Sequence, residues 1–192
     1  MQISEANTGN TFSIFNLGFR VFFLAAGVFS VVSIVFWSAI YLFNITLPID
    51  AISSSQWHAH EMVYGYAVAV MAGFLLTAVK NWTGVQTLHG KSLMALFSLW
   101  FIARVLFLFG TAYLTAAAIV DSLFLFFLTV AIAYPVIKVK QWSQMGILSK
   151  VILLLVFNVL FYLGAMGIIS EGVYWGIYGG IYLVIGLILT MG

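Results

Sequence analysis

One stretch decides the fold class of this chain: Trp57–Gly84 reads WHAHEMVYGYAVAVMAGFLLTAVKNWTG. It opens with two histidines and a glutamate, His58, His60 and Glu61. About 18 almost wholly apolar residues follow, which is near the length that crosses a bilayer as a helix. Ionisable groups at the mouth of a membrane helix are costly to bury and usually functional. The stretch therefore predicts both a membrane span and a candidate functional site.

The whole chain has the composition of a polytopic membrane protein. Of its 192 residues, 64% are hydrophobic and 6% are charged, whereas a soluble domain has about 25% charged residues. The net charge of +2 is carried by single basic residues spread over loops, so it does not indicate a nucleic-acid partner. The absence of cysteine excludes disulfides, thiolate-ligated haem, cysteine-ligated iron–sulfur clusters and covalent haem attachment.

No sequence motif supports a hydrolase or a nucleotide-driven enzyme. The chain has no P-loop, no Rossmann glycine pattern, no nucleophile elbow and no H-E-x-x-H motif. The search for function therefore rests on polar residues inside the apolar segments.

Six apolar segments are long enough to span a membrane. They are residues 19–43, 57–79, 93–110, 114–137, 147–169 and 173–191. The segments lack the alternation of an outer-membrane barrel, so all should be helices. We predict an all-α transmembrane bundle of six spans, forming a single domain over residues 1–192.

The loop charges predict the orientation of the bundle. The basic residues of alternate loops fall on the side of the N-terminus: Arg20, Lys80, Lys91, Lys138, Lys140 and Lys150. Asp50 and Glu171 lie in loops of the opposite side. The positive-inside rule then makes the N-terminus cytoplasmic, with His58 and His60 at the outer face. Trp57 is predicted to lie at the outer membrane interface.

Both ends of the chain carry information. Residues 1–18 are polar and contain no lysine or arginine, which is unlike a cleavable signal peptide, so the first apolar segment should stay as a span. The sixth segment stays apolar to Gly192 with no basic flank. We therefore expect a longer protein to continue beyond this point, or the chain to stop there naturally.

Several polar residues are predicted to share one depth in the outer half of the bundle. Helices rise 1.5 Å per residue, which puts Arg104 and Asp121 at matching depths of about 10 Å on adjacent antiparallel helices. The same layer should contain His58, His60, Glu61, Tyr64 and Tyr162. Arg104 and Asp121 could form a structural ion pair, or Arg104 could neutralise a haem propionate or another anion.

The two histidines should point in different directions. Residues two apart on a helix lie about 200° apart, so His58 and His60 cannot face one metal ion together. His58 could share a face with Glu61, His60 could share a face with Tyr64, or both could lie in a non-helical turn capped by Ser54 or Ser55. At least one of the two histidines could ligate haem or a metal ion. The alternative is that they form a polar gate or have a structural role. His89, in a short loop, is predicted to be solvated.

Other features indicate helix packing. Asn158 should hydrogen-bond to another helix, and Asn81 should cap the second span, with a left-handed turn at Gly84. Gly172, Gly176 and Gly180 form a ridge that lets a neighbouring backbone approach closely, which hints at contact with a missing half.

The chain resembles the NnrS family of bacterial membrane proteins. The motifs that carry the resemblance are Leu17-Gly18-Phe19-Arg20, Trp57-His58-Ala59-His60-Glu61-Met62, Gly73-Phe74-Leu75-Leu76-Thr77-Ala78-Val79 and Asn81-Trp82-Thr83-Gly84. The resemblance implies a protein of the bacterial cytoplasmic (inner) membrane that contains b-type haem and copper and is linked to nitric oxide, denitrification and nitrosative stress. Family members are usually about twice this length, so the chain would correspond to the N-terminal half.

The resemblance suggests roles for the polar layer. His58 and His60 would be ligands of haem or copper, Glu61 would orient an imidazole or hold a proton, and Arg104 would meet a propionate with Asp121 as its partner. The family commonly has proline at the position of Lys80 and often histidine at the position of Tyr162, which leaves Tyr162 as a less common haem ligand.

Two other classes of function remain open. The charged layer and the glycine-rich sixth segment would also suit half of a transporter or permease. A cofactor-assembly factor for respiratory enzymes is the second alternative. The expected partners are the lipid bilayer and either a second six-helix half or respiratory enzyme subunits.

Overall fold

The computed structural model describes residues 13–43, 45, 48 and 50–191, which form helices and connecting turns without a strand. Residues 1–12 and Gly192 lie outside the described residues. The predictions about the two chain ends rest partly on these residues. The α-helices are α1 (Gly18–Phe43), α2 (Ser54–His60), α3 (Val68–Thr83), α4 (Gly90–Leu108), α5 (Leu114–Lys138), α6 (Met145–Ala165) and α7 (Gly172–Met191). Short 3-10 turns occupy Ser13–Asn16, Thr111–Tyr113 and Trp142–Gln144, and a π-helix, η2, occupies Glu61–Ala67.

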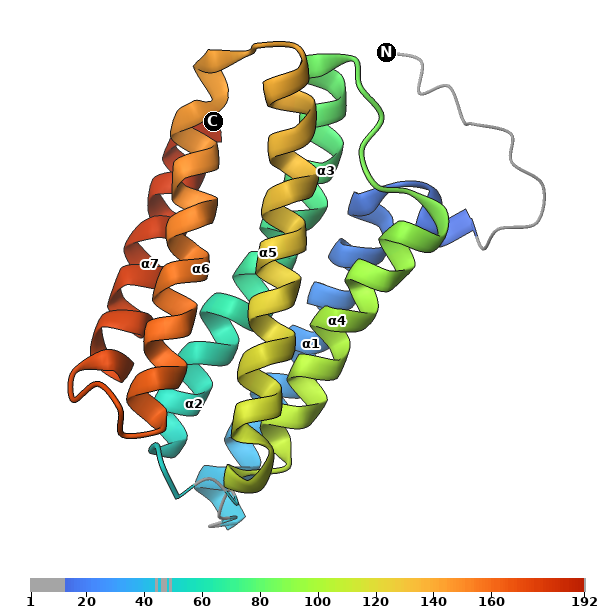
Figure 1. The fold of residues 1–192 in the computed structure, drawn as a ribbon. Coiled ribbons are helices and arrows are strands. Elements are labelled where there is room, and N and C mark those ends of the chain that lie inside the picture. The colour runs from blue at the N-terminus through green and yellow to red at the C-terminus, as the bar shows by residue number, and fades with distance from the viewer. Residues whose placement is uncertain (1–12, 44, 46–47, 49, 192) are drawn as a thin grey trace.

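Within the part of the chain that the structure describes, six helices are long and apolar enough to cross a membrane, as predicted. Successive spans run in opposite directions (Figure 1), with the α3–α4 and α5–α6 connections at one end and the α1–α2, α4–α5 and α6–α7 connections at the other. The chain is therefore a multi-pass membrane protein whose six spans form one all-α bundle.

The second span, Ser54–Thr83, is the central helix of the bundle. It joins α2, η2 and α3 into one continuous helix. In its apolar 18-residue window, 67% of the residues are buried, whereas the corresponding share is at most 44% in any other span. The helix begins with a capping box: the Ser53 hydroxyl accepts a hydrogen bond from the Gln56 N–H, and the Ser53 N–H donates to Gln56 Oε1. The N-cap is therefore Ser53, and the non-helical entry turn considered for the histidines does not form.

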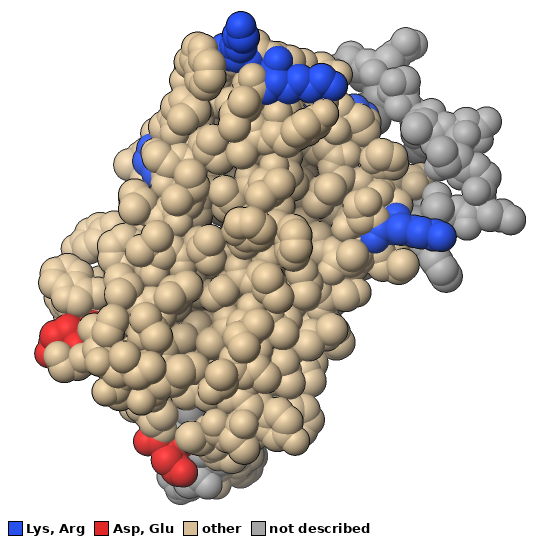
Figure 2. Space-filling view, viewed as in Figure 1, with Lys and Arg blue, Asp and Glu red and all other residues tan. Residues whose placement is uncertain are grey.

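The two ends of the bundle differ in charge. Figure 2 shows lysine and arginine side chains over the upper part of the molecule and acidic side chains near its lower end. The upper end carries the α3–α4 and α5–α6 connections with their lysines, and the lower end carries Asp50 and Glu171. We call the upper end the basic end. The bundle thus has the charge asymmetry on which the predicted orientation depends.

Two details of the second span differ from expectation. Trp57 is 2% exposed and packs edge-on against Phe36 at a centroid distance of 5.5 Å, so its indole faces the core and not the outer surface of the bundle. At the far end, Asn81 lies inside α3. The helix is closed by Gly84 instead, which has φ 69° and donates its N–H to the carbonyl of Lys80. The left-handed turn at Gly84 was predicted correctly.

The glycine ridge of α7 packs within this chain and not on a missing half. A Cβ added to Gly176 would lie 2.4 Å from Phe161 Cβ, and one added to Gly172 would lie 2.5 Å from the Leu160 carbonyl oxygen of α6. A Cβ at Gly180 would lie 2.6 Å from the hydroxyl of Tyr64 in η2. The ridge therefore allows α7 to contact α6 and the central helix at backbone distance.

Replacing Gly176 with alanine should lower the thermal stability of the purified protein. The new methyl group would overlap Phe161 side-chain and backbone atoms, and overpacking of this kind costs about 1–3 kcal/mol. Gly27→Ala on α1 is the matched control, because nothing lies within 4 Å of an added Cβ there. Thermal unfolding in detergent should show a lower midpoint for Gly176→Ala and an unchanged or higher one for Gly27→Ala. Equal midpoints for the two variants would contradict the packing role.

Candidate functional site

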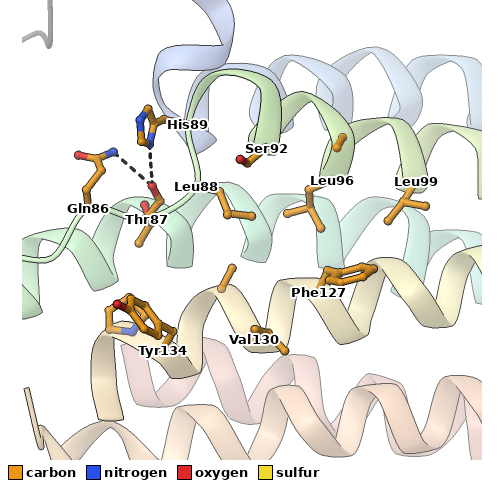
Figure 3. Close-up of a pocket in the computed structure, with 13 residues that line it drawn as sticks. Gln86, Thr87, Leu88, His89, Ser92, Leu96, Leu99, Phe127, Val130 and Tyr134 are labelled. Carbon is orange, nitrogen blue, oxygen red and sulfur yellow. Dashed lines mark hydrogen bonds between the residues drawn. The ribbon is translucent and has the colours of Figure 1, made fainter. Parts of the chain in front are cut away.

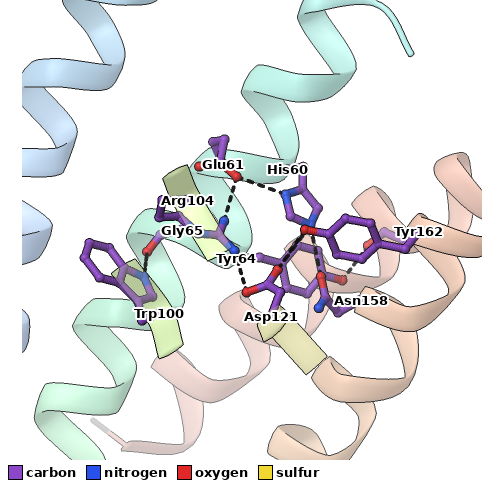
Figure 4. A network of polar contacts seen from close by, with 10 residues as sticks. His60, Glu61, Tyr64, Gly65, Trp100, Arg104, Asp121, Asn158 and Tyr162 are labelled. Carbon is purple, nitrogen blue, oxygen red and sulfur yellow. Dashed lines mark hydrogen bonds and ion pairs between the residues drawn. The ribbon is translucent and has the colours of Figure 1, made fainter. Parts of the chain in front are cut away.

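Six polar side chains from four spans meet in the bundle interior (Figure 4), and each is at most 3% exposed. They are His60 of α2, Glu61 of η2, Arg104 of α4, Asp121 of α5, and Asn158 and Tyr162 of α6. We call this set the buried polar cluster. It contains five members of the predicted layer together with Asn158.

Arg104 lies between the two carboxylates of the buried polar cluster. Its Nη1 donates to Glu61 Oε1 at 2.6 Å, and its Nη2 forms an ion pair with Asp121 Oδ1. Ionised groups removed from water need this kind of pairing, because an unpaired buried charge is strongly destabilising. A haem propionate could reach Arg104 only by displacing Glu61 or Asp121. The guanidinium is therefore suited to holding α4, α5 and the central helix together.

Both ring nitrogens of His60 already have oxygen partners. Nδ1 lies 3.2 Å from Glu61 Oε1, and Nε2 lies 2.9 Å from Asn158 Oδ1 and 3.8 Å from Asp121 Oδ2. A metal ion needs a free imidazole lone pair, and neither nitrogen presents one to an open space. Asn158 thus does bond another helix, as predicted, and its partner is one of the candidate ligands.

Aromatic rings enclose the His60 imidazole. It stacks on Phe161 at a centroid distance of 4.1 Å, and Tyr64, Phe107 and Tyr162 lie at 4.8, 5.0 and 5.2 Å. This packing leaves no room for a porphyrin beside the ring. His60 therefore fits a positioning role inside the core better than ligation of haem or metal.

The two tyrosines of the layer have their own partners. Tyr162 donates its hydroxyl to Asp121 Oδ2 at 3.2 Å, and Tyr64 donates to the carbonyl of Gly176 on α7 at 2.7 Å. The NnrS resemblance suggested Tyr162 as a less common haem ligand. Its hydroxyl is instead hydrogen-bonded to the Asp121 carboxylate. Tyr64 links the central helix to the glycine ridge.

The π-helix η2 is the local feature that brings Glu61 and Gly65 toward α4. Trp100 Nε1 donates to the carbonyl of Gly65 at 2.9 Å (Figure 4). A Cβ at Gly65 would lie 2.8 Å from a Phe29 ring carbon and 3.2 Å from Arg104 Nη1. A side chain at this position would therefore overlap the Phe29 ring and lie in tight contact with the guanidinium. π-helical turns are rare and are frequent at functional sites.

His58 lies outside the buried polar cluster, on another face of α2. Its ring stacks on Trp37 of α1, with a centroid distance of 4.3 Å and an interplanar angle of 12°. Its Nδ1 is buried and has no hydrogen-bond partner among the described residues. The neighbouring Trp57 Nε1 is also buried without a partner. The structure thus separates the two candidate histidines, and only His58 retains an unsatisfied ring nitrogen.

The donor set limits which group could bind. Within residues 13–43 and 50–191, no three His, Cys, Asp or Glu side chains are arranged to hold a metal ion together. Haem needs fewer protein ligands than a bare ion, because the porphyrin supplies four nitrogens and one histidine can hold the iron. Among these predicted ligands, His58 alone retains a ring nitrogen without a hydrogen-bond partner among the described residues, whereas His60, Arg104 and Tyr162 are already bonded to neighbouring side chains.

Sequence reasoning missed several parts of the site. Trp37 and Phe161 flank the histidines, and Trp100 bonds the π-helix. Trp37 and Trp100 carry a signal, since a tryptophan within an apolar span needs a partner for its N–H or a polar face to cover. Phe161 carries none in a chain with 18 phenylalanines. His89 is exposed, and its Nδ1 lies 3.1 Å from the Thr87 carbonyl oxygen, in agreement with its predicted solvation.

Comparison with known proteins identifies the family. The chain matches the family described as NnrS protein over residues 13–192, which is most of its length. No curated protein sequence and no solved structure gives a significant match. The match includes all six spans and every residue of the buried polar cluster. On this evidence the chain is a multi-pass membrane protein that belongs to the NnrS family.

Proposed function

We propose that the protein protects a bacterial cell against nitric oxide stress from within the cytoplasmic membrane, and that it does so with a haem held by His58. Family membership supports the link to nitric oxide stress. The observation that carries the ligand assignment is the buried Nδ1 of His58, which has no hydrogen-bond partner among the described residues. Bound haem would supply an iron centre able to bind nitric oxide. For copper, no group of three His, Cys, Asp or Glu side chains among the described residues supports a site.

The chain's own residues would hold His58 in position. His60 and Glu61 fix the inner face of the α2–η2 junction through the buried polar cluster. The opposite face then presents His58 toward Trp37, whose indole covers one side of the imidazole. Because the ring is held between α2 and α1, its free nitrogen keeps one direction. The buried polar cluster is thus a positioning device in this proposal and makes no contact with the haem.

The test is the absorption spectrum and metal content of the purified protein, compared with His58→Ala and His89→Ala. Expression with added haem should give a Soret band in the unchanged protein and in His89→Ala, whose histidine is exposed at the basic end. His58→Ala should lose the band while remaining folded, because the buried nitrogen of His58 forms no hydrogen bond with the described residues. Cells carrying His58→Ala should also grow more poorly than the control in the presence of a nitric oxide donor.

Two results would overturn the proposal in different ways. A full Soret band in His58→Ala would remove His58 as the ligand while leaving haem in place. A protein without a Soret band, even with haem supplied, would remove the haem itself. Substrate flux in proteoliposomes of such an empty protein would then favour the transporter alternative.

A further inference from the structure

A cavity of about 520 Å³ lies between α4 and α5 at the basic end of the bundle (Figure 3), away from the buried polar cluster. Its length follows the lining residues: Ser92 to Leu99 on α4 and Phe127 to Tyr134 on α5 each extend it about 10 Å along the helix axis. A cavity of this volume is in the range of small-molecule sites. None of the residues that line it takes part in the proposed function.

The cavity is amphipathic along its length. Gln86, Thr87 and His89 gather at one end in Figure 3, Ser92 lies farther along α4, and Leu99 and Phe127 lie toward the other end. The polar end is built by the α3–α4 connection, in which Gln86 Nε2 and His89 Nδ1 both contact the Thr87 carbonyl, at 3.4 and 3.1 Å. The polar end of the cavity therefore lies at the end of the spans, and the apolar part extends from it toward the bundle middle.

The surroundings of the polar end are positively charged. Lys91 follows the connection at the start of α4 and is exposed, and Lys138 lies with its Nζ 5.6 Å from the ring centroid of Tyr134, which lines the cavity. Among the described residues, both exposed carboxylates, Asp50 and Glu171, belong to the connections of the opposite end. The polar end of the cavity thus complements an anion, and the apolar part beyond it complements a hydrocarbon chain.

We propose that this cavity binds an anionic phospholipid, with one acyl chain between α4 and α5 and the phosphate between Lys91 and Lys138. Basic pockets between membrane helices recognise lipid head groups through charge, and each basic side chain near the surface contributes roughly fivefold in affinity. A neutral lipid would fill the apolar part without gaining the charge contribution. His58 does not line the cavity, so the lipid proposal can be tested independently of the haem proposal.

The experiment is a lipid titration of the full chain in detergent, followed by native mass spectrometry. Phosphatidylglycerol and phosphatidylcholine with identical acyl chains are the two probes. Ala95→Phe, which places a ring in the cavity from an exposed position on α4, is paired with Ala116→Phe, an exposed alanine of α5 that does not line it. Lys91→Gln/Lys138→Gln is paired with Lys140→Gln/Lys150→Gln, which removes the same charge from the same end.

The pattern of effects separates the cavity from diffuse attraction. Phosphatidylglycerol should bind the unchanged protein more tightly than phosphatidylcholine. Lys91→Gln/Lys138→Gln should weaken phosphatidylglycerol alone by about 25-fold, and Ala95→Phe should weaken both lipids, while the two controls change little.

Three outcomes would overturn the proposal. The first is equal binding of the two lipids by the unchanged protein. The second is equal weakening by the two lysine pairs, which would mean diffuse charge attraction instead of a site. The third is tighter binding of an isoprenoid quinone than of phosphatidylglycerol in the same titration, since the occupant would then be a neutral ring.

Discussion

Replacing Arg104 with methionine should destabilise the folded protein by about 3–5 kcal/mol, because the change leaves two buried carboxylates without their shared partner. Glu61 and Asp121 are 1% and 0% exposed and contact the two Nη atoms of Arg104. Methionine fills much of the volume but offers no hydrogen-bond donor. Within the buried polar cluster, His60 is then the only other group that can carry a positive charge.

The measurement is unfolding of the detergent-solubilised protein by increasing SDS, followed by helical circular dichroism. Lys91→Met is the matched control, since it removes one positive charge from an exposed position on the same helix. It should leave the unfolding midpoint within experimental scatter, as exposed charges contribute little.

A second step asks whether the loss comes from unpaired charge. Adding Glu61→Gln and Asp121→Asn to Arg104→Met converts the buried ions to neutral groups, and such wholesale replacement is often neutral or stabilising. The triple variant should therefore recover most of the lost stability. If the triple variant is no more stable than Arg104→Met, loss of the guanidinium's shape and packing explains the effect, and unpaired charge does not.

The fold was predictable because its main signal is local. A run of some 20 apolar residues forms a helix in a bilayer whatever surrounds it. Depth was predictable for the same reason: counting residues at a fixed rise puts Arg104 and Asp121 at one level, and the structure brings them into contact. Consecutive spans must cross the membrane in opposite directions, so their alternation could be predicted once the spans were identified.

The angular positions of side chains were much less predictable. The π-helix Glu61–Ala67 changes the direction in which successive residues point, and no residue type in EMVYGYA announces it. The identity of contacts also depends on neighbours far along the chain. Asn158 reaches His60 across 98 positions, and Tyr64 reaches Gly176 across 112.

The two histidines show which features of the site could be predicted from the sequence and which could not. A helix was enough to predict that His58 and His60 diverge. It could not predict which face would be enclosed, because enclosure depends on Phe107 and Phe161 for His60 and on Trp37 for His58. The choice between a ligand and a core histidine therefore needed the structure.

Replacing His60 with leucine should cost about 2–3 kcal/mol of stability and leave the proposed haem in place. Leucine keeps the apolar contacts with the surrounding rings, but Asn158 Oδ1 and Glu61 Oε1 lose the ring nitrogens that lie 2.9 and 3.2 Å from them. A buried polar group left without its partner costs about 1–3 kcal/mol. Glu61 retains Arg104, so most of the loss should come from Asn158, whose Nδ2 already lacks a partner.

The contrast with His58→Leu makes this result decisive. His58 is half-buried and stacks on a single indole, so its replacement should change the SDS unfolding midpoint little while abolishing the Soret band. Adding Asn158→Leu to His60→Leu removes the orphaned amide and should restore stability, a gain that a lost metal ligand would not give. If His60→Leu instead loses haem at an unchanged unfolding midpoint, then His60 is the ligand, and the hydrogen bond at the ring nitrogen that binds the iron must open when the cofactor binds.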